Sequence, residues 1–169
     1  MRMTEKFLDL LLAWISHNGI DDLSIGIDNE SHFNMEENEI VLGVIDIHEI
    51  EEWTEEYWNY LGMKWKNLHP MVLRFLHEFG HYHTLYTFSP DELLLYNLSK
   101  PVIDLDAAEA KKDMFDYWKM PDEDAANKWA IEFMNDESNM YQIYELNDIF
   151  EIFWNDVLDE VCAEVSNNE

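Results

Sequence analysis

Residues 70–84 of this 169-residue chain read PMVLRFLHEFGHYHT, an apolar helical pattern that carries two histidines and a glutamate in its middle. Pro70 suits the first turn of a helix, where the N–H that it lacks would have no partner in any case. Large apolar side chains then recur every three or four residues and form one stripe: Val72, Phe75, Phe79 and Tyr82. The stretch therefore predicts a core helix over residues 70–84.

The same helix contains the motif H-E-x-x-H, from His77 to His81. Histidines four residues apart lie on one face of a helix, so both rings can reach one metal ion at about 2.0–2.1 Å. Glu78 lies about 100° further around the helix than His77, because an α-helix has 3.6 residues per turn. Its carboxylate is therefore expected to miss the metal and to take a proton from a water bound to it.

A catalytic zinc ion takes three protein ligands and leaves its fourth position to water. The extended motif H-E-x-x-H-x-x-G-x-x-H is excluded, because Thr84 and Thr87 stand where it needs Gly and His. His83 is close in sequence, but it points about 200° away from His81 around the helix. The third ligand is therefore expected to be a carboxylate from a later helix.

Two later segments offer this carboxylate. Glu109 stands 28 residues after His81 and is followed four residues later by Asp113, which is the spacing of thermolysin-type enzymes. Glu123 stands 42 residues after His81. Both remain candidates on spacing alone.

The surroundings of Glu123 favour it over the other candidate. It lies in the first turn of a helix that Pro121 begins, in the pattern E-x-x-A-N-x-aromatic-A. Asn127, one turn along, could accept the N–H of a ligating imidazole and so fix the ring. The small side chains of Ala126 and Ala130 would let this helix lie close to the H-E-x-x-H helix.

Together, the sequences H-E-F-G-H and E-x-x-A-N-x-W-A resemble the motifs of ImmA/IrrE-type metallopeptidases, which are small gluzincin-like proteins common in phages and mobile elements. The resemblance implies a zincin-like fold and a Zn²⁺ ion held by His77, His81 and Glu123. It implies that Glu78 is the catalytic base. It also implies a cytoplasmic protein substrate, which in that family is often a helix-turn-helix repressor.

The hydrophobic period changes twice before the H-E-x-x-H helix, which predicts an α+β fold in a single domain over residues 1–169. A first helix is expected over residues 4–18 and a small antiparallel sheet over residues 22–47, with the H-E-x-x-H helix beneath the sheet. The strand within residues 39–47 is apolar at nearly every position, so we expect it to be covered on both faces. Further helices are expected over residues 50–62, from residue 89, and over residues 104–117, 121–134 and 146–165.

The composition restricts the partners. The chain has 37 Asp and Glu against 10 Lys and Arg, a formal charge of -27, which would repel nucleic-acid phosphates and anionic membranes. No apolar run reaches the ~20 residues that span a bilayer. The N-terminal segment lacks the features of a signal peptide, and the lone Cys162 fits a reducing compartment, so we expect a cytoplasmic protein.

The leading hypothesis is therefore a zinc-dependent metallopeptidase that acts on a cytoplasmic protein or peptide. Three tyrosines could donate a hydrogen bond to an oxyanion beside the metal: Tyr82, Tyr86 and Tyr117. The charge leaves a second hypothesis open, a non-catalytic acidic interaction protein that imitates the charge of DNA. A metal-binding structural module without turnover is the third.

Overall fold

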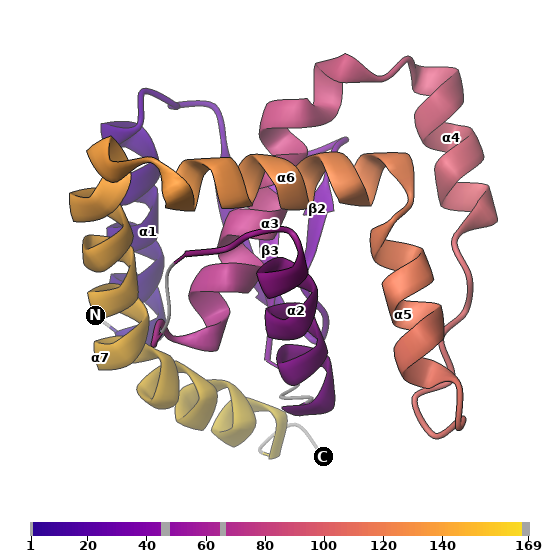
Figure 1. Ribbon diagram of the computed structural model, residues 1–169. Coiled ribbons are helices and arrows are strands. Elements are labelled where there is room, and N and C mark those ends of the chain that lie inside the picture. Colours follow the sequence, from indigo (N-terminus) through magenta and orange to yellow (C-terminus); the bar gives the residue numbers. More distant parts are fainter. Residues whose placement is uncertain (1, 45–47, 65–66, 167–169) are drawn as a thin grey trace.

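The computed structural model describes residues 2–44, 48–64 and 67–166 (Figure 1). The fold is α+β, mostly helical, with one three-stranded sheet near the N-terminus. The seven α-helices of the described residues are α1 (Met3–His17), α2 (His48–Tyr60), α3 (Pro70–Thr84), α4 (Pro90–Ser99), α5 (Ala110–Trp118), α6 (Pro121–Asn135) and α7 (Met140–Ser166). Short 3₁₀ turns occupy Leu85–Thr87 and Glu137–Asn139.

The sheet is mixed, so the prediction of an antiparallel sheet is wrong. Its strands are β1 (Ser24–Asp28), β2 (His32–Asn34) and β3 (Glu39–Gly43), in the order β1-β3-β2. β3 pairs antiparallel with β2 and parallel with β1. The sequence pattern did not reveal β2, which is only three residues long and adds a second reversal of the chain between β1 and β3.

β3 is the central strand, and Ile40, Val41 and Leu42 are all buried, as expected for a strand covered on both faces. The predicted strand extended to residue 47. β3 ends at Gly43, and residues 45–47 lie outside the described residues.

The helix predicted over residues 104–117 is shorter than expected. α5 begins only at Ala110, and the residues before it form turns: the Asp104 side chain accepts a hydrogen bond from the backbone N–H of Asp106 at 3.1 Å, and the N–H of Ala110 donates to the carbonyl of Ala107. Such a local bond offers the backbone an alternative to a helix. The residues before α5 instead form an extended connection and turns, and they become important at the site.

α3 lies between the sheet and α6, as predicted for the helix that carries the motif. It contacts β2 and β3 on one side, and α6 crosses it on the other (Figure 1). Its aromatic side chains anchor it to the rest of the core: Phe75 and Phe79 lie 5.5 and 5.7 Å from the ring of Trp14 on α1. The middle of α3 is thereby held at the centre of the molecule.

Gly80 brings α3 and α6 into backbone contact. A Cβ atom added at Gly80 would lie 2.4 Å from the carbonyl oxygen of Ala126, which is itself fully buried. A glycine in the middle of a helix costs roughly 0.5–1 kcal/mol relative to alanine. The close approach of the two helices explains why it stands here.

We expect Gly80→Ala to destabilise the protein, because the added methyl group meets backbone that cannot rotate away. Overpacking of this kind typically costs about 1–3 kcal/mol, partly offset by the better helix propensity of alanine. Urea denaturation followed by circular dichroism measures the change. Gly26→Ala in β1 is the matched control, since its Cβ would meet only the flexible Glu39 carboxylate. An unfolding midpoint at or above that of the parent would contradict the proposed helix contact.

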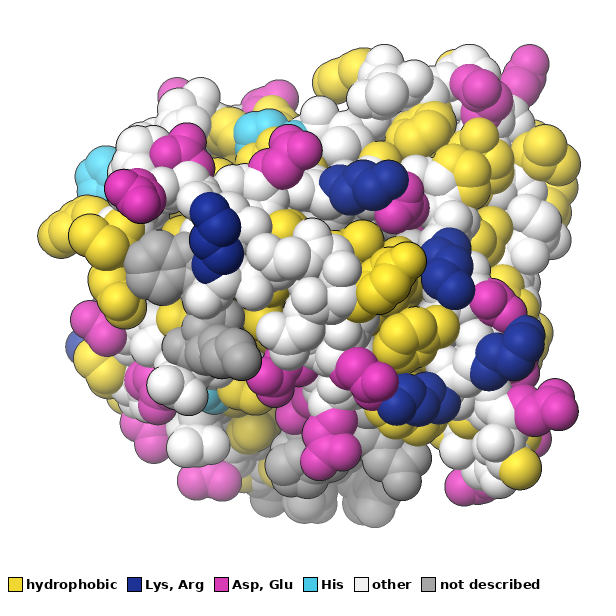
Figure 2. Space-filling view, in the orientation of Figure 1, with side chains coloured by type: hydrophobic (Ala, Val, Ile, Leu, Met, Phe, Trp, Pro, Cys, Tyr) yellow, Lys and Arg dark blue, Asp and Glu magenta, His cyan; other side chains and the backbone are white. Residues whose placement is uncertain are grey.

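The acidic residues do not gather in one patch on the face shown in Figure 2, where they are spread out and interspersed with lysine and arginine. None of the helices in the described ranges combines the length and apolar character needed to cross a membrane.

Candidate metal centre

Three side-chain atoms from α3 and α6 converge on one point. The Nε2 atoms of His77 and His81 lie 3.2 Å apart, and Glu123 Oε2 lies 3.1 Å from the first and 3.4 Å from the second. Ligands of a tetrahedral zinc ion at about 2.0–2.1 Å are separated from one another by roughly 3.3 Å. The triangle thus has the size of one face of such a site.

The electrostatics of the triangle also suit a cation. Glu123 is only 1% exposed, and its Oε2 atom has no aligned hydrogen-bond donor among the described residues. Burial alone would raise the pKa of Glu123, but the two imidazoles hold it well below its usual range. Burial alone would lower the pKa of His77, but the carboxylates of Glu123 and Glu78 raise it to about 9. The same charges that attract a proton here would attract a metal ion.

The other oxygen of Glu123 is held by two residues. Oε1 accepts hydrogen bonds from the Tyr117 hydroxyl at 2.8 Å and from Lys100 Nζ at 2.6 Å. Lys100 also lies 3.3 Å from the buried carboxylate of Asp122. These contacts turn Oε2 toward the imidazoles.

Asn127 fixes the orientation of one of these imidazoles. Its Oδ1 atom lies 3.0 Å from His77 Nδ1 and accepts a second hydrogen bond from the indole N–H of Trp58 at 2.7 Å. An acceptor at Nδ1 favours the tautomer with its proton there, which leaves the Nε2 lone pair free for a metal. Asn127 and Trp58 are both buried, so this arrangement is rigid.

We expect Asn127→Ala to weaken Zn²⁺ binding by about 10–100-fold, the usual cost of losing a residue that orients a ligand. Competition with a chromophoric chelator measures the affinity. Asn127→Asp keeps an acceptor at the same place and should retain Zn²⁺ binding. Trp58→Phe removes the hydrogen bond from the indole to Asn127 but leaves the contact of Asn127 with His77, so it measures the indole contact by itself. Unchanged affinity of the alanine variant would show that Asn127 has only a packing role.

Glu78 lies beside the triangle. It is 6% exposed, and one of its carboxylate oxygens lies within 4.8 Å of ring nitrogens of both His77 and His81. His77, Glu78 and His81 therefore form a group that could hold a metal ion. Glu123 completes a tighter set with the two histidines and leaves Glu78 facing the adjoining cavities.

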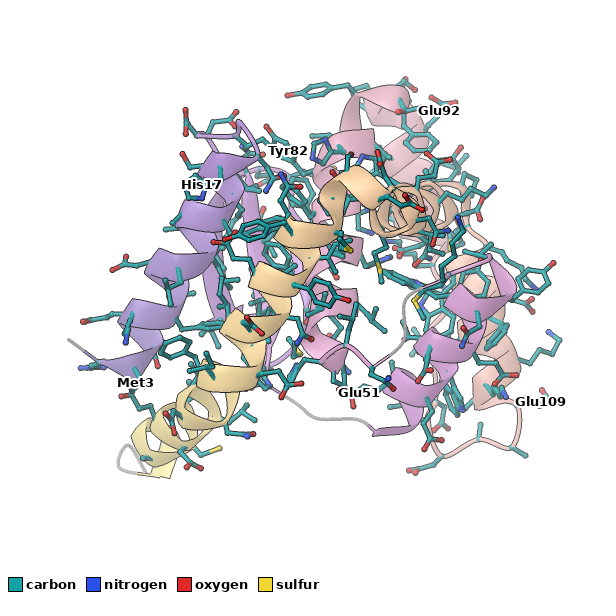
Figure 3. All side chains as sticks on the ribbon, turned by 60° about the vertical axis from the view of Figure 1, so that its left-hand side comes forward. Met3, His17, Glu51, Tyr82, Glu92 and Glu109 are labelled. Carbon is teal, nitrogen blue, oxygen red and sulfur yellow. The ribbon has the colours of Figure 1, made fainter. Side chains whose placement is uncertain are left out.

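Of the remaining sequence candidates, only Tyr117 lies at the site. Glu109 is exposed at the N-terminus of α5, and Figure 3 shows it at the outer end of that helix, far from Tyr82 on α3. The ring of His83 stacks on Trp129 with centroids 4.2 Å apart, and its burial lowers its pKa. Of the three tyrosines, only Tyr117 lines the site. Tyr82 donates to Asp22 at 2.9 Å, and Tyr86 is 92% exposed.

Sequence reasoning missed Lys100, Asp122 and Trp58 in the surroundings of the site. Lys100 follows α4 and Trp58 belongs to α2, so no local spacing connects either of them to the motifs. Asp122 is adjacent to Glu123 in the sequence, but an acidic residue in the first turn of a helix is ordinary. A signal for Gly80 was present, since a glycine inside an apolar helix often marks a close backbone contact.

Comparison with known proteins identifies no relative of this chain: no protein-family model matches it, and neither does any curated protein or solved structure.

Proposed function

We propose that this protein is a zinc-dependent metallopeptidase that hydrolyses a peptide bond of a cytoplasmic protein. In this proposal His77, His81 and Glu123 are the metal ligands and Glu78 is the general base. The observation that carries it is the triangle of ligand atoms, with sides of 3.1 to 3.4 Å, beside a buried glutamate.

Two imidazoles and one carboxylate form a ligand set typical of catalytic zinc. When bound, zinc lowers the pKa of a water molecule in its open position and polarises the substrate carbonyl. Glu78 would accept a proton from the attacking water and pass it to the nitrogen of the leaving amine. Asn127 would keep His77 in the binding tautomer, and Lys100 with Tyr117 would keep Oε2 of Glu123 toward the imidazoles.

The charge and the motifs support a protein substrate. A net charge of -27 favours partners with basic surfaces and disfavours direct contact with nucleic acids. The resemblance to ImmA/IrrE-type peptidases suggests a repressor as one such partner. The cytoplasmic location is part of this proposal, and the exposed thiol of Cys162 agrees with it.

The same charge supports a second candidate, a non-catalytic acidic protein that occupies a basic partner. A mimic of duplex DNA needs its carboxylates in an ordered array, whereas those in Figure 2 are scattered. A mimic would also have no use for the buried carboxylates at the candidate metal centre, and burial of charge without a function is costly.

The test measures zinc and cleavage on the same preparation. Elemental analysis should give one Zn²⁺ per chain. Mass spectrometry of a mixture of unstructured peptides should show new termini that disappear with a chelator and return with added Zn²⁺. One equivalent of zinc without cleavage would favour a structural metal module. Absence of both zinc and cleavage would favour the acidic interaction protein.

A further inference from the structure

Two cavities meet at the candidate metal centre. The first, about 140 Å³, lies against β2 and α4 and is lined mainly by polar groups around the triangle. The second, about 340 Å³, lies between α2, α5 and the connection that precedes α5. Ser31, His77, Glu78 and Tyr117 line both of them. The two cavities therefore adjoin one another at these four side chains, of which Glu78 is one.

The second cavity has a mixed lining. Glu78, Tyr117 and Asn127 belong to the candidate metal centre or contact it. Five further lining residues are apolar: Ile50, Ile103, Leu105, Met114 and Trp118. Asn29, Glu30, Ser31 and Thr54 add polar side chains. Arg74 is also in the lining, with the Glu51 carboxylate 3.8 Å from its guanidinium.

The extended connection between α4 and α5 builds one of these walls. Alternate residues face the cavity: Ile103 and Leu105 are half-buried, whereas Val102 is 98% exposed and Asp104 is exposed. The sequence predicted a helix from residue 104, which would have included Leu105 but not Ile103. The connection is instead extended from Ile103 up to Leu105, and alternate side chains of an extended chain point to the same side, so both can line one wall.

The size of the cavity suits a large side chain. An apolar cavity of about 150 Å³ is enough to bind benzene, and ligand pockets generally measure about 300–1,000 Å³. The five apolar side chains of the lining favour an apolar occupant, because an apolar surface without packed partner atoms forfeits dispersion contacts. The position of the cavity indicates which substrate residue would occupy it. Residues of an extended peptide are about 3.3 Å apart, so a peptide whose cleaved bond lies at Glu78 would place an adjoining residue at this cavity.

We infer that this cavity binds a large apolar side chain of the substrate, such as Leu, Met or Phe, from a residue directly beside the cleaved bond. The inference rests on the proposed peptidase function, and it adds the determinant of sequence preference. The apolar residues of the lining would select the substrate side chain, and Glu78, which lines the same cavity, would lie next to the adjoining peptide bond.

A library of unstructured peptides tests the preference. Among cleaved bonds, one adjoining position should be enriched at least ~10-fold in Leu, Met and Phe over Ala and Gly, since apolar pockets discriminate by about 10–200-fold per methylene group. Ile103→Trp should fill the cavity, remove this preference and lower kcat/KM for the Leu peptides at least ~10-fold. Val102→Trp is the matched control. Val102 is adjacent to Ile103 but exposed to solvent, so this substitution should change neither the apolar preference nor kcat/KM.

A binding measurement separates this inference from the proposed function. Two-dimensional NMR should detect N-acetyl-phenylalaninamide in the parent protein at concentrations where N-acetyl-alaninamide has no effect, and Ile103→Trp should abolish that binding. Binding with this pattern but no cleavage of any peptide would refute the peptidase and retain the apolar subsite. Cleavage without an apolar preference, or with a preference unchanged in a folded Ile103→Trp variant, would retain the peptidase and refute the subsite.

Discussion

Glu78→Gln is expected to lower peptide turnover by at least ~10²-fold while one Zn²⁺ per chain stays bound. Glutamine preserves the shape of the side chain and much of its hydrogen bonding, but it cannot accept the proton of the attacking water. Glu78 is buried, and it is the only acidic residue of α3, so no other carboxylate of this helix can take over its role. Turnover is measured on a peptide found in the cleavage assay, and zinc by elemental analysis.

Glu132→Gln is the matched control for this change, because it removes a carboxylate from an exposed position on α6 and should leave turnover intact. Equal turnover by Glu78→Gln and the parent would refute the assignment of Glu78 as the base. Loss of zinc together with turnover would instead make Glu78 a ligand.

Glu123→Ala is expected to abolish stoichiometric zinc binding, with a larger loss of affinity than the 10–100-fold expected for Asn127→Ala. The alanine removes the one anionic corner of the triangle and leaves two imidazoles that must bind the ion alone. Titration of the metal-free protein with Zn²⁺ against a chromophoric chelator measures the loss. Glu109→Ala, at the exposed N-terminus of α5, should bind zinc like the parent.

Removal of Glu123 also strips Lys100 and Tyr117 of a common acceptor, so a second variant guards against a folding defect. Glu123→Gln keeps an oxygen for these donors but removes the charge, and circular dichroism would confirm that it folds. A folded Glu123→Gln or Glu123→Ala with full zinc affinity, alongside a Glu109→Ala that loses zinc, would reverse the choice of third ligand.

The two histidines of α3 suffice as a metal site only when a third ligand joins them, and the packing of the helices determines which residue that can be. Two histidines one helical turn apart bind a metal only if a third group approaches from another element. α6 approaches because Gly80 and Ala126 allow backbone contact, which places Glu123 within 3.4 Å of both rings. A single methyl group at Gly80 would push α6 away from α3, and with it Glu123 away from the two histidines.

Features that depend on short separations along the chain could be predicted from the residues alone. The bounds of α3 were predicted over residues 70–84, because a proline and a helical apolar stripe are both local signals. The shared face of His77 and His81 follows from helix geometry alone. Pro121 likewise indicated the start of α6, and with it the place of Glu123 in a first turn.

Features that join distant parts of the chain could not be predicted in this way, because they depend on how the helices and strands pack. The three-residue strand β2 lies between β1 and β3 in the sequence, so β1 and β3 run parallel. The packing of α6 on α3 brings Glu123, and not Glu109, to the two histidines. The contacts of Lys100 with Glu123 and of Trp58 with Asn127 come from the residue after α4 and from α2, which no spacing relates to the motifs. Side-chain direction within a helix repeats with a fixed period and is encoded locally, whereas the position of one helix against another depends on the fit of all the surfaces between them.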